Sequence, residues 1–149
     1  MKLRSICTCG LALFLALTLS LPALAAGSYS DVPAGAWYAE AVAEATADGL
    51  MDGVSDTLFS PNTPVTRAMV VTTLWRLEGE PAPAAQSAFS DVPEGTWYTQ
   101  AVNWAAEVGI AAGNGSGAFV PAVAVTREQL AVFLYNYCRY KGMETAEGV

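Results

Sequence analysis

Apolar residues recur at helical spacing in four segments of the chain, and the four segments form two pairs. In the first pair, one helix is expected from about Trp37 to Leu50 and a second helix after Thr66. In the second pair, one helix is expected to start at about Trp97 and the other after Thr126. A loop rich in Gly, Ser and Pro separates the helices of each pair. The pattern therefore predicts an all-α chain of tandem helix-loop-helix units.

Each predicted helix carries one apolar stripe. The stripes of the earlier helices are Trp37, Ala41, Val42, Ala45 and Gly49, with Trp97, Ala101, Val102, Ala105 and Gly109 in the second unit; those of the later helices are Val70, Val71, Leu74 and Leu77, with Leu130, Phe133, Leu134 and Tyr137. Gly79 and Gly142 are suitable residues to end the later helices. Two short helices cannot bury their stripes alone, so the helix pairs are expected to stack on one another.

The two units are copies of one sequence. Residues 29–38 read Tyr-Ser-Asp-Val-Pro-Ala-Gly-Ala-Trp-Tyr, and residues 89–98 read Phe-Ser-Asp-Val-Pro-Glu-Gly-Thr-Trp-Tyr. The offset of 60 residues continues without a gap and places Val65-Thr66-Arg67 on Val125-Thr126-Arg127. The expected organisation is a first repeat over 28–80, a linker over 81–88, a second repeat over 89–142, and a segment over 143–149 that is either a tail or the start of a missing third repeat.

The first 26 residues are typical of a secretory signal peptide. Lys2 and Arg4 precede an apolar stretch from Ile6 to Leu21, and Ala23-Leu24-Ala25-Ala26 provides a small-residue cleavage site. A transmembrane anchor is the alternative, but polar residues interrupt the apolar stretch and a cleavage site follows it. We therefore expect a secreted chain that has no membrane segment after cleavage.

The balance of charged residues excludes several classes of function. The chain carries seven basic and 14 acidic residues, a net charge of −7. Removal of the signal peptide takes two basic residues and no acidic one, which leaves five against 14, a net charge of −9. A chain this acidic is not expected to bind nucleic acid, because that needs a basic surface.

The scarcity of reactive side chains argues against catalysis. Cys138 alone remains after cleavage, so no disulfide can form within the chain. The chain has no histidine, which removes the usual general base and the commonest zinc ligand. Only carboxylates remain for catalysis, and nothing singles out a pair of them. We expect no enzyme activity, no metal and no other cofactor.

A set of short motifs identifies a family. Ser-Asp-Val-Pro is followed by Trp-Tyr, then by Gly-Leu-Met-Asp-Gly, Phe-Ser-Pro and Val-Thr-Arg-Ala, and the second unit matches in order and spacing. Together the motifs resemble the S-layer homology repeat over about residues 28–142. The resemblance implies a non-catalytic module that anchors exported proteins to secondary cell-wall polymers, often pyruvylated, at the bacterial cell surface. It also implies that three repeats usually form a helical, pseudo-threefold assembly with polysaccharide grooves between repeats.

Two features depart from the family pattern. The Glu of the family's Thr-Arg-Ala-Glu motif is replaced by Met69 in the first repeat and by Gln129 in the second. Thr66 and Thr126 are expected to cap their helices, and a Glu or Gln three residues later would complete a capping box. Gln129 can do this and Met69 cannot. The second departure is the number of repeats: with two, only part of the assembly is expected, and further repeats or self-association would complete it.

The resemblance also implies which residues line the polysaccharide grooves. They are the motif arginine, the early aspartate and the tryptophan of each repeat: Arg67, Arg127, Asp31, Asp91, Trp37 and Trp97. The two arginines fall in the first turn of a helix, where the helix dipole disfavours a cation. Free amides and a guanidinium together suit a carboxylate such as that of a pyruvyl ketal. An ion pair with Asp31 or Asp91, or an arginine stem packed over the core, is the alternative.

The tryptophans and aspartates also have structural alternatives. Trp37 and Trp97 would stack on a sugar ring or anchor the core at the start of a helix. Asp31 and Asp91 would hydrogen-bond a sugar hydroxyl or act as turn and cap residues beside a proline.

The sequence thus predicts a wall-anchoring module whose partner is an anionic, pyruvylated secondary cell-wall polysaccharide, a polymer linked to peptidoglycan. The alternative is a structural or protein-interaction module at the cell surface with weak or lost polysaccharide binding.

Overall fold

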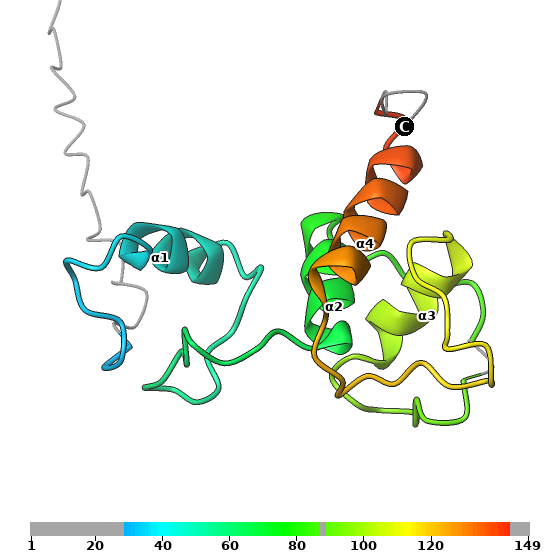
Figure 1. Ribbon diagram of the computed structural model, residues 1–149, viewed down its shortest axis with the longest axis horizontal. Coiled ribbons are helices and arrows are strands. Elements are labelled where there is room, and N and C mark those ends of the chain that lie inside the picture. The colour runs from blue at the N-terminus through cyan, green and yellow to red at the C-terminus, as the bar shows by residue number, and fades with distance from the viewer. Residues whose placement is uncertain (1–28, 87–88, 144–149) are drawn as a thin grey trace, which may run out of the picture.

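The computed structural model describes residues 29–86 and 89–143, and in these residues the chain forms four helices and no sheet (Figure 1). The helices are α1 (Ala39–Ala47), α2 (Arg67–Leu77), α3 (Thr99–Glu107) and α4 (Arg127–Tyr140). The predicted all-α class is confirmed. The predicted signal peptide at 1–26 lies outside the described residues, as do 87–88 of the linker and 144–149 of the last segment. None of the described helices has the length and apolar character that a membrane span requires.

The two later helices begin where the sequence predicts. The Thr66 hydroxyl accepts a hydrogen bond from the Met69 N–H, and the Thr126 hydroxyl accepts one from the Gln129 N–H, both at 3.3 Å. In α4 the Gln129 side-chain oxygen also accepts from the Thr126 N–H, which completes a capping box. Met69 provides no such acceptor in α2. The predicted difference between the two caps is confirmed.

The two earlier helices are shorter than predicted. Trp37 and Trp97 lie in turns before α1 and α3, outside the helices and their stripes. Gly49 follows the C-cap of α1 with a φ of 68°, a left-handed conformation that ends a helix instead of continuing it. Gly109 follows the C-cap of α3 in the same left-handed conformation, with a φ of 76°. The prediction that these four residues belong to buried helical stripes is therefore wrong.

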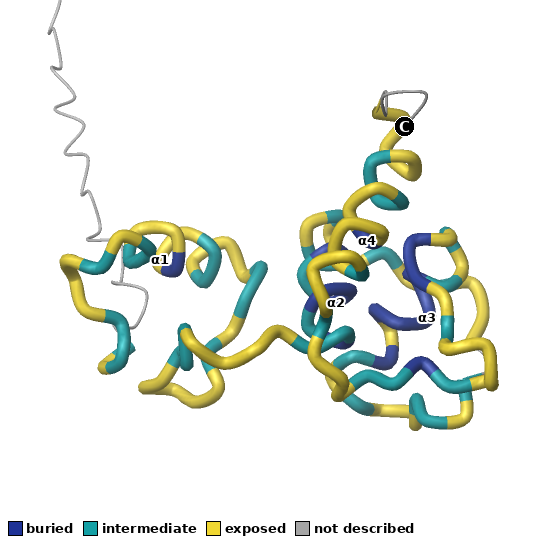
Figure 2. The backbone as a smooth tube through the Cα atoms, viewed as in Figure 1, coloured by how far each residue is buried: buried dark blue, intermediate teal, exposed yellow. Residues whose placement is uncertain are grey.

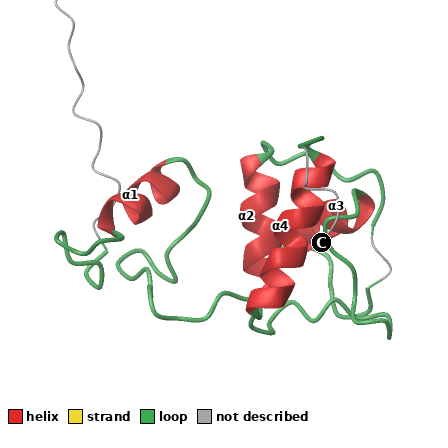
Figure 3. Cartoon of the chain, turned by 45° about the horizontal axis from the view of Figure 1, so that its top comes forward, coloured by secondary structure: helices red, strands yellow, loops and turns green. Residues whose placement is uncertain are grey.

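The core forms between the repeats. Helix α2 of the first repeat packs against α3 and α4 of the second, and these three helices lie together in two views (Figures 1 and 3). Val71 of α2 and Val102 of α3 are fully buried, together with Ile110 and Phe119 of the segment that follows α3. Stacking of helices is thus confirmed for α2, α3 and α4, and it occurs across the repeat boundary.

The other helical faces stay exposed (Figure 2). Helix α1 packs against no other described helix, and Val42 is its one buried residue. On α4 only Phe133 of the predicted stripe is buried, whereas Leu130 and Leu134 are exposed. Leu77 of α2 is exposed as well. The hydrophobic pattern predicted buried positions that the described chain leaves uncovered.

A polar contact joins the ends of α2 and α4. The Tyr137 hydroxyl donates to Glu78 Oε1 at 2.5 Å, and Lys141 Nζ lies 3.0 Å from the same carboxylate. Partial burial and the neighbouring Glu78 raise the pKa of Tyr137 to about 12. This contact fixes the C-terminal half of α4 on the first repeat.

Candidate functional site

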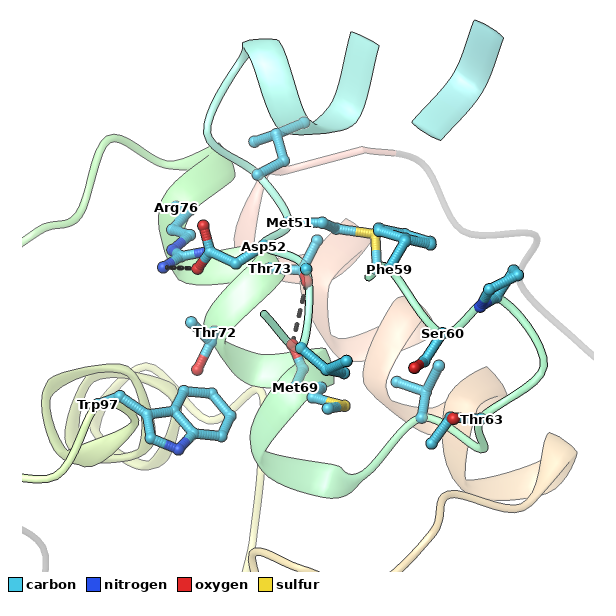
Figure 4. A pocket seen from close by; sticks show the side chains of 15 residues that line it. Met51, Asp52, Phe59, Ser60, Thr63, Met69, Thr72, Thr73, Arg76 and Trp97 are labelled. Carbon is cyan, nitrogen blue, oxygen red and sulfur yellow. Dashed lines mark hydrogen bonds and ion pairs between the residues drawn. The ribbon is translucent and has the colours of Figure 1, made fainter. Parts of the chain in front are cut away.

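A cleft of about 470 Å³ opens between α2 and the loop that precedes it, and Trp97 of the second repeat lines one side (Figure 4). Its volume lies in the range of small-ligand sites. Helix α2 contributes Met69, Thr72, Thr73 and Arg76 to the wall. The cleft therefore combines side chains from both repeats.

Thr72 has a buried hydroxyl that lacks a hydrogen-bond partner. The residue is 4% exposed, and Oγ1 makes no hydrogen bond in the part of the chain that the structure describes. The neighbouring Thr73 hydroxyl, by contrast, donates to the Met69 carbonyl at 3.0 Å. Figure 4 shows the Thr72 hydroxyl on the side of α2 that faces Trp97. An unpaired buried hydroxyl costs about 1–3 kcal/mol.

Arg76 supplies a cation to the cleft. Its Nη2 lies 2.6 Å from Asp52 Oδ2, and its Nε lies 3.9 Å from Glu80 Oε1. The Asp52 side chain is 70% exposed, so water screens this ion pair. The Arg76 side chain itself is only 24% exposed, so the solvent-accessible part of this ion pair is the Asp52 carboxylate.

Trp97 presents an open indole to the same cleft. The residue is 59% exposed, and its ring packs edge-on against Tyr98 with centroids 5.1 Å apart. Trp37 makes the equivalent edge contact with Tyr38 at 5.5 Å but is 94% exposed and does not line the cleft. The two tryptophans thus differ in surroundings, and Trp97 is the one beside other polar groups.

Arg67 is engaged by the backbone of the second repeat. Its Nε donates to the Phe119 carbonyl at 2.9 Å, and its Nη2 donates to the Ala112 carbonyl at 2.7 Å. The guanidinium also lies over the rings of Phe119 and Phe133, at 4.7 and 5.2 Å. Burial lowers the pKa of Arg67, and the charge of Asp91 partly opposes this shift. Arg67 therefore links the two repeats through carbonyls and packs over core rings. This agrees with the alternative of an arginine packed over the core, and differs from the anion site and the ion pair.

Arg127 has no such partner. It is exposed, and its side chain makes no hydrogen bond, ion pair or ring contact with the described residues. The difference from Arg67 follows from position, because a second repeat follows α2 whereas no described repeat follows α4.

The two aspartates close loops inside their own repeats. Asp31 accepts from the N–H groups of Phe59 and Ser60, at 2.9 and 2.7 Å. Asp91 accepts from those of Phe119 and Val120, both at 2.7 Å. Both carboxylates thus have a structural role, but it differs from the local turn or cap expected from the sequence, because the amides from which they accept lie 28 and 29 residues away.

Comparison with known proteins defines the family. The profile of the S-layer homology domain matches residues 28–68 and 88–131, which together make up more than half of the chain. The chain belongs to the S-layer homology domain family. Domains of this family are non-catalytic modules that generally anchor proteins to the cell wall, and the proteins that carry them are cell-surface and S-layer proteins.

Curated relatives show the same assignment. A cell surface protein of Thermoanaerobacter kivui is 34% identical over 125 residues, which cover 80% of this chain and 16% of the relative. The surface-layer 125 kDa protein of Lysinibacillus sphaericus is 33% identical over 112 residues, or 70% of this chain and 9% of the relative. Endo-1,4-beta-xylanase A of Thermoanaerobacterium saccharolyticum is 32% identical over 108 residues, which cover 9% of that enzyme. The S-layer homology chain thus spans less than a fifth of the length of these relatives.

The six residues predicted from the sequence do not form one cluster. Trp97 lies in the cleft, Arg67 and Asp91 lie close enough for their charges to interact, and Asp31, Trp37 and Arg127 lie elsewhere. The sequence did not point to Thr72 or Arg76. Arg76 is one of only five basic residues after the signal peptide, and this scarcity was the available signal. Among the described residues, no cluster of acidic or cysteine side chains could hold a metal ion.

Proposed function

We propose that this S-layer homology chain holds a protein at the bacterial cell wall by binding an anionic, pyruvylated secondary cell-wall polysaccharide, and that the cleft at Trp97 is a binding site. The observation that carries the proposal is the combination of an open indole, an unpaired buried hydroxyl and an arginine in one cleft of about 470 Å³. Membership of the family supports the wall as the target.

Each of the three groups matches one part of such a polymer. The indole of Trp97 offers an apolar face for a sugar ring. The Thr72 hydroxyl, which is buried in the described chain, pairs with a sugar hydroxyl once the ligand displaces the groups that cover it. Arg76 binds the carboxylate of the pyruvyl group in place of Asp52, since a guanidinium recognises carboxylates through paired hydrogen bonds.

The remaining residues predicted from the sequence stay predictions as ligand contacts. Asp31 and Asp91 already accept two backbone amides each, and Arg67 already donates to two carbonyls. Trp37 and Arg127 are exposed and available in the described chain. The exposed apolar face of α4 favours the second candidate, a protein-interaction module with weak polysaccharide binding.

Sedimentation with purified wall sacculi separates these functions. The purified chain is expected to sediment with intact sacculi and to stay in solution with sacculi from which the secondary polymers have been stripped. Trp97→Ala is expected to weaken sedimentation, whereas Trp37→Ala, the matched change in the other repeat, leaves the cleft intact. Failure of the unaltered chain to sediment would overturn the proposal, and equal loss in both variants would remove the cleft as its site.

Thr72→Val tests the contribution of the unpaired hydroxyl. Valine has the same shape and no polar atom, so the variant is expected to be more stable than the unaltered chain by up to about 1 kcal/mol. Loss of one hydrogen bond to the polymer is expected to weaken binding about threefold to tenfold. Urea unfolding and titration with released wall polymer measure the two effects.

Thr73→Val is the matched control, because its hydroxyl already donates to the Met69 carbonyl. This control is expected to lose stability and to keep its affinity for the polymer. A Thr72→Val variant that is destabilised and binds normally would contradict the role given to this hydroxyl.

A further inference from the structure

Two methionine side chains line the cleft that holds Trp97 (Figure 4). Met51 belongs to the loop before α2, and Met69 belongs to the first turn of α2, so each wall of the cleft carries one thioether. Both residues are half-buried. Sulfur is therefore part of the surface that a ligand in the cleft would touch, although none of the contacts proposed above uses it.

The two thioethers occur in the first repeat and not in the second. The residues sixty positions later are Ala111 and Gln129. The side chain of Gln129 turns back to accept a hydrogen bond from the Thr126 N–H, whereas Met69 provides no such acceptor in α2. The same helix position thus serves the cap in the second repeat and lines the cleft in the first.

Neither thioether belongs to the core between the repeats. Among the described residues, the buried cluster and the side chains packed against it include neither Met51 nor Met69. A polar atom added to either sulfur would therefore change the cleft and leave the core as it is. Methionine is an apolar side chain to which such an atom can be added, because oxidation converts its thioether to a sulfoxide.

We propose that Met51 and Met69 form an oxidation site, at which conversion of the thioethers to sulfoxides by a peroxide lowers the affinity of the cleft for the wall polymer. The sulfur lone pair attacks one oxygen of hydrogen peroxide, and an S–O bond forms as the O–O bond breaks. The released hydroxide takes the remaining proton and leaves as water. The sulfur loses two electrons and the peroxide gains them. The effect on binding rests on the function proposed above, whereas the oxidation itself does not.

A sulfoxide is expected to weaken binding because its oxygen faces an apolar surface. Leu50, Phe59 and Val65 line the cleft together with the two methionines. These side chains cannot donate a hydrogen bond to the sulfoxide oxygen, so water solvates it in the empty cleft. A sugar that packs against this surface would remove that water. Burial of an unpaired polar group is expected to lower the affinity about fivefold or more.

Peptide mapping after treatment with hydrogen peroxide tests the oxidation site. Met143 is the internal reference, because it is 58% exposed and does not line the cleft. In the folded chain Met143 is expected to be oxidised first, and Met51 and Met69 more slowly but completely, since both are half-buried. The same mapping checks that Trp97 is unmodified. If Met51 and Met69 react only after unfolding in urea, the proposal is overturned.

Sedimentation with wall sacculi tests the effect on binding. The fully oxidised chain is expected to bind about fivefold more weakly or less, and the loss is expected to follow the oxidation of Met51 and Met69 and not the earlier oxidation of Met143. Treatment with methionine sulfoxide reductases is expected to restore binding. Equal binding before and after oxidation would overturn the inference and leave the proposed function intact. Failure of the untreated chain to sediment would overturn the proposed function and the effect on binding, but not the oxidation site.

Leucine substitutions test whether these two sulfurs cause the loss. Leucine has about the volume of methionine and no sulfur, so the chain with both Met51→Leu and Met69→Leu is expected to fold and to bind like the untreated chain. After peroxide treatment this variant is expected to keep its binding, whereas Met143→Leu, the matched control, is expected to lose it. Loss of binding by the double variant after peroxide would show that oxidation of another residue is responsible and would contradict the proposal.

Discussion

A single carboxylate closes the same loop in both repeats. Asp31 and Asp91 each accept two backbone amides from residues 28 and 29 positions later, so each joins the start of its repeat to the segment before the second helix. The amide of Phe59 lowers the pKa of Asp31. For Asp91, partial burial raises the pKa, but the amides of Phe119 and Val120 and the charge of Arg67 lower it by more in total.

These two shifts predict acid sensitivity. A carboxyl whose pKa is lower in the folded state stabilises the fold at pH values above its unfolded pKa of about 3.9. This contribution is lost as the pH falls through the folded pKa, because the protonated carboxyl no longer accepts hydrogen bonds from both backbone N–H groups. The free energy of unfolding is therefore expected to be flat above about pH 5 and to decline below about pH 4. Urea unfolding at a series of pH values measures this.

The substitution Asp91→Asn tests whether the Asp91 carboxylate causes the loss of stability at low pH. The asparagine NH₂ cannot accept a hydrogen bond, so the variant is expected to be less stable at pH 7 and to lose less stability on acidification. Asp56→Asn changes an exposed loop acid and serves as the control, with the acid dependence retained. An unaltered acid profile in the Asp91 variant would show that other carboxyls, such as Glu78, cause the decline.

At the level of elements, the two later helices differ in one capping contact. Gln129 returns a hydrogen bond to the Thr126 amide in α4, and Met69 cannot do so in α2. Gln129→Met is expected to lower the free energy of unfolding by about 0.5–1 kcal/mol, because one amide of the first turn loses its acceptor. The reciprocal change Met69→Gln is expected to raise it by a few tenths of a kcal/mol. Thermal unfolding of the two variants checks the sign, and a loss in both would contradict the capping explanation.

Helix starts were predictable because their causes are local. The cap residues Thr66 and Thr126 and the residue three positions later lie within one turn of chain. Burial was not predictable in the same way. Leu134 lies on a helical stripe like that of Leu74, yet a neighbouring repeat covers only Leu74. Trp37 and Trp97 were placed on helices because the apolar pattern does not distinguish a helix start from the turn before it.

The candidate site could likewise be predicted only where its residues belong to a local motif. Trp97 was identified from the repeat motif, whereas Thr72 and Arg76 join it only because α2 packs across the repeat boundary. Arg67 was expected to meet an anion, since its place in the first helical turn has no local explanation. Its partners are carbonyls 45 and 52 residues away, and no local pattern encodes them.

On the scale of the whole molecule, burial is unequal between the repeats. Helices α2 and α3 provide most of the buried positions, whereas α1 contributes only Val42 and contacts no other described helix. Elements with few buried contacts open at lower free energy than the global unfolding of a protein. The first helix of the first repeat is therefore the weakest element of the described chain.

Hydrogen exchange tests this inequality. The amides of α1 are expected to exchange at least about tenfold faster than those of α3, because α1 opens without disrupting the core. Val42 is the one buried residue of α1, whereas most residues of α3 are buried, so opening of α1 exposes little apolar surface. Equal protection of the two helices would show that α1 is stabilised by contacts other than helix packing and would contradict this order of stability.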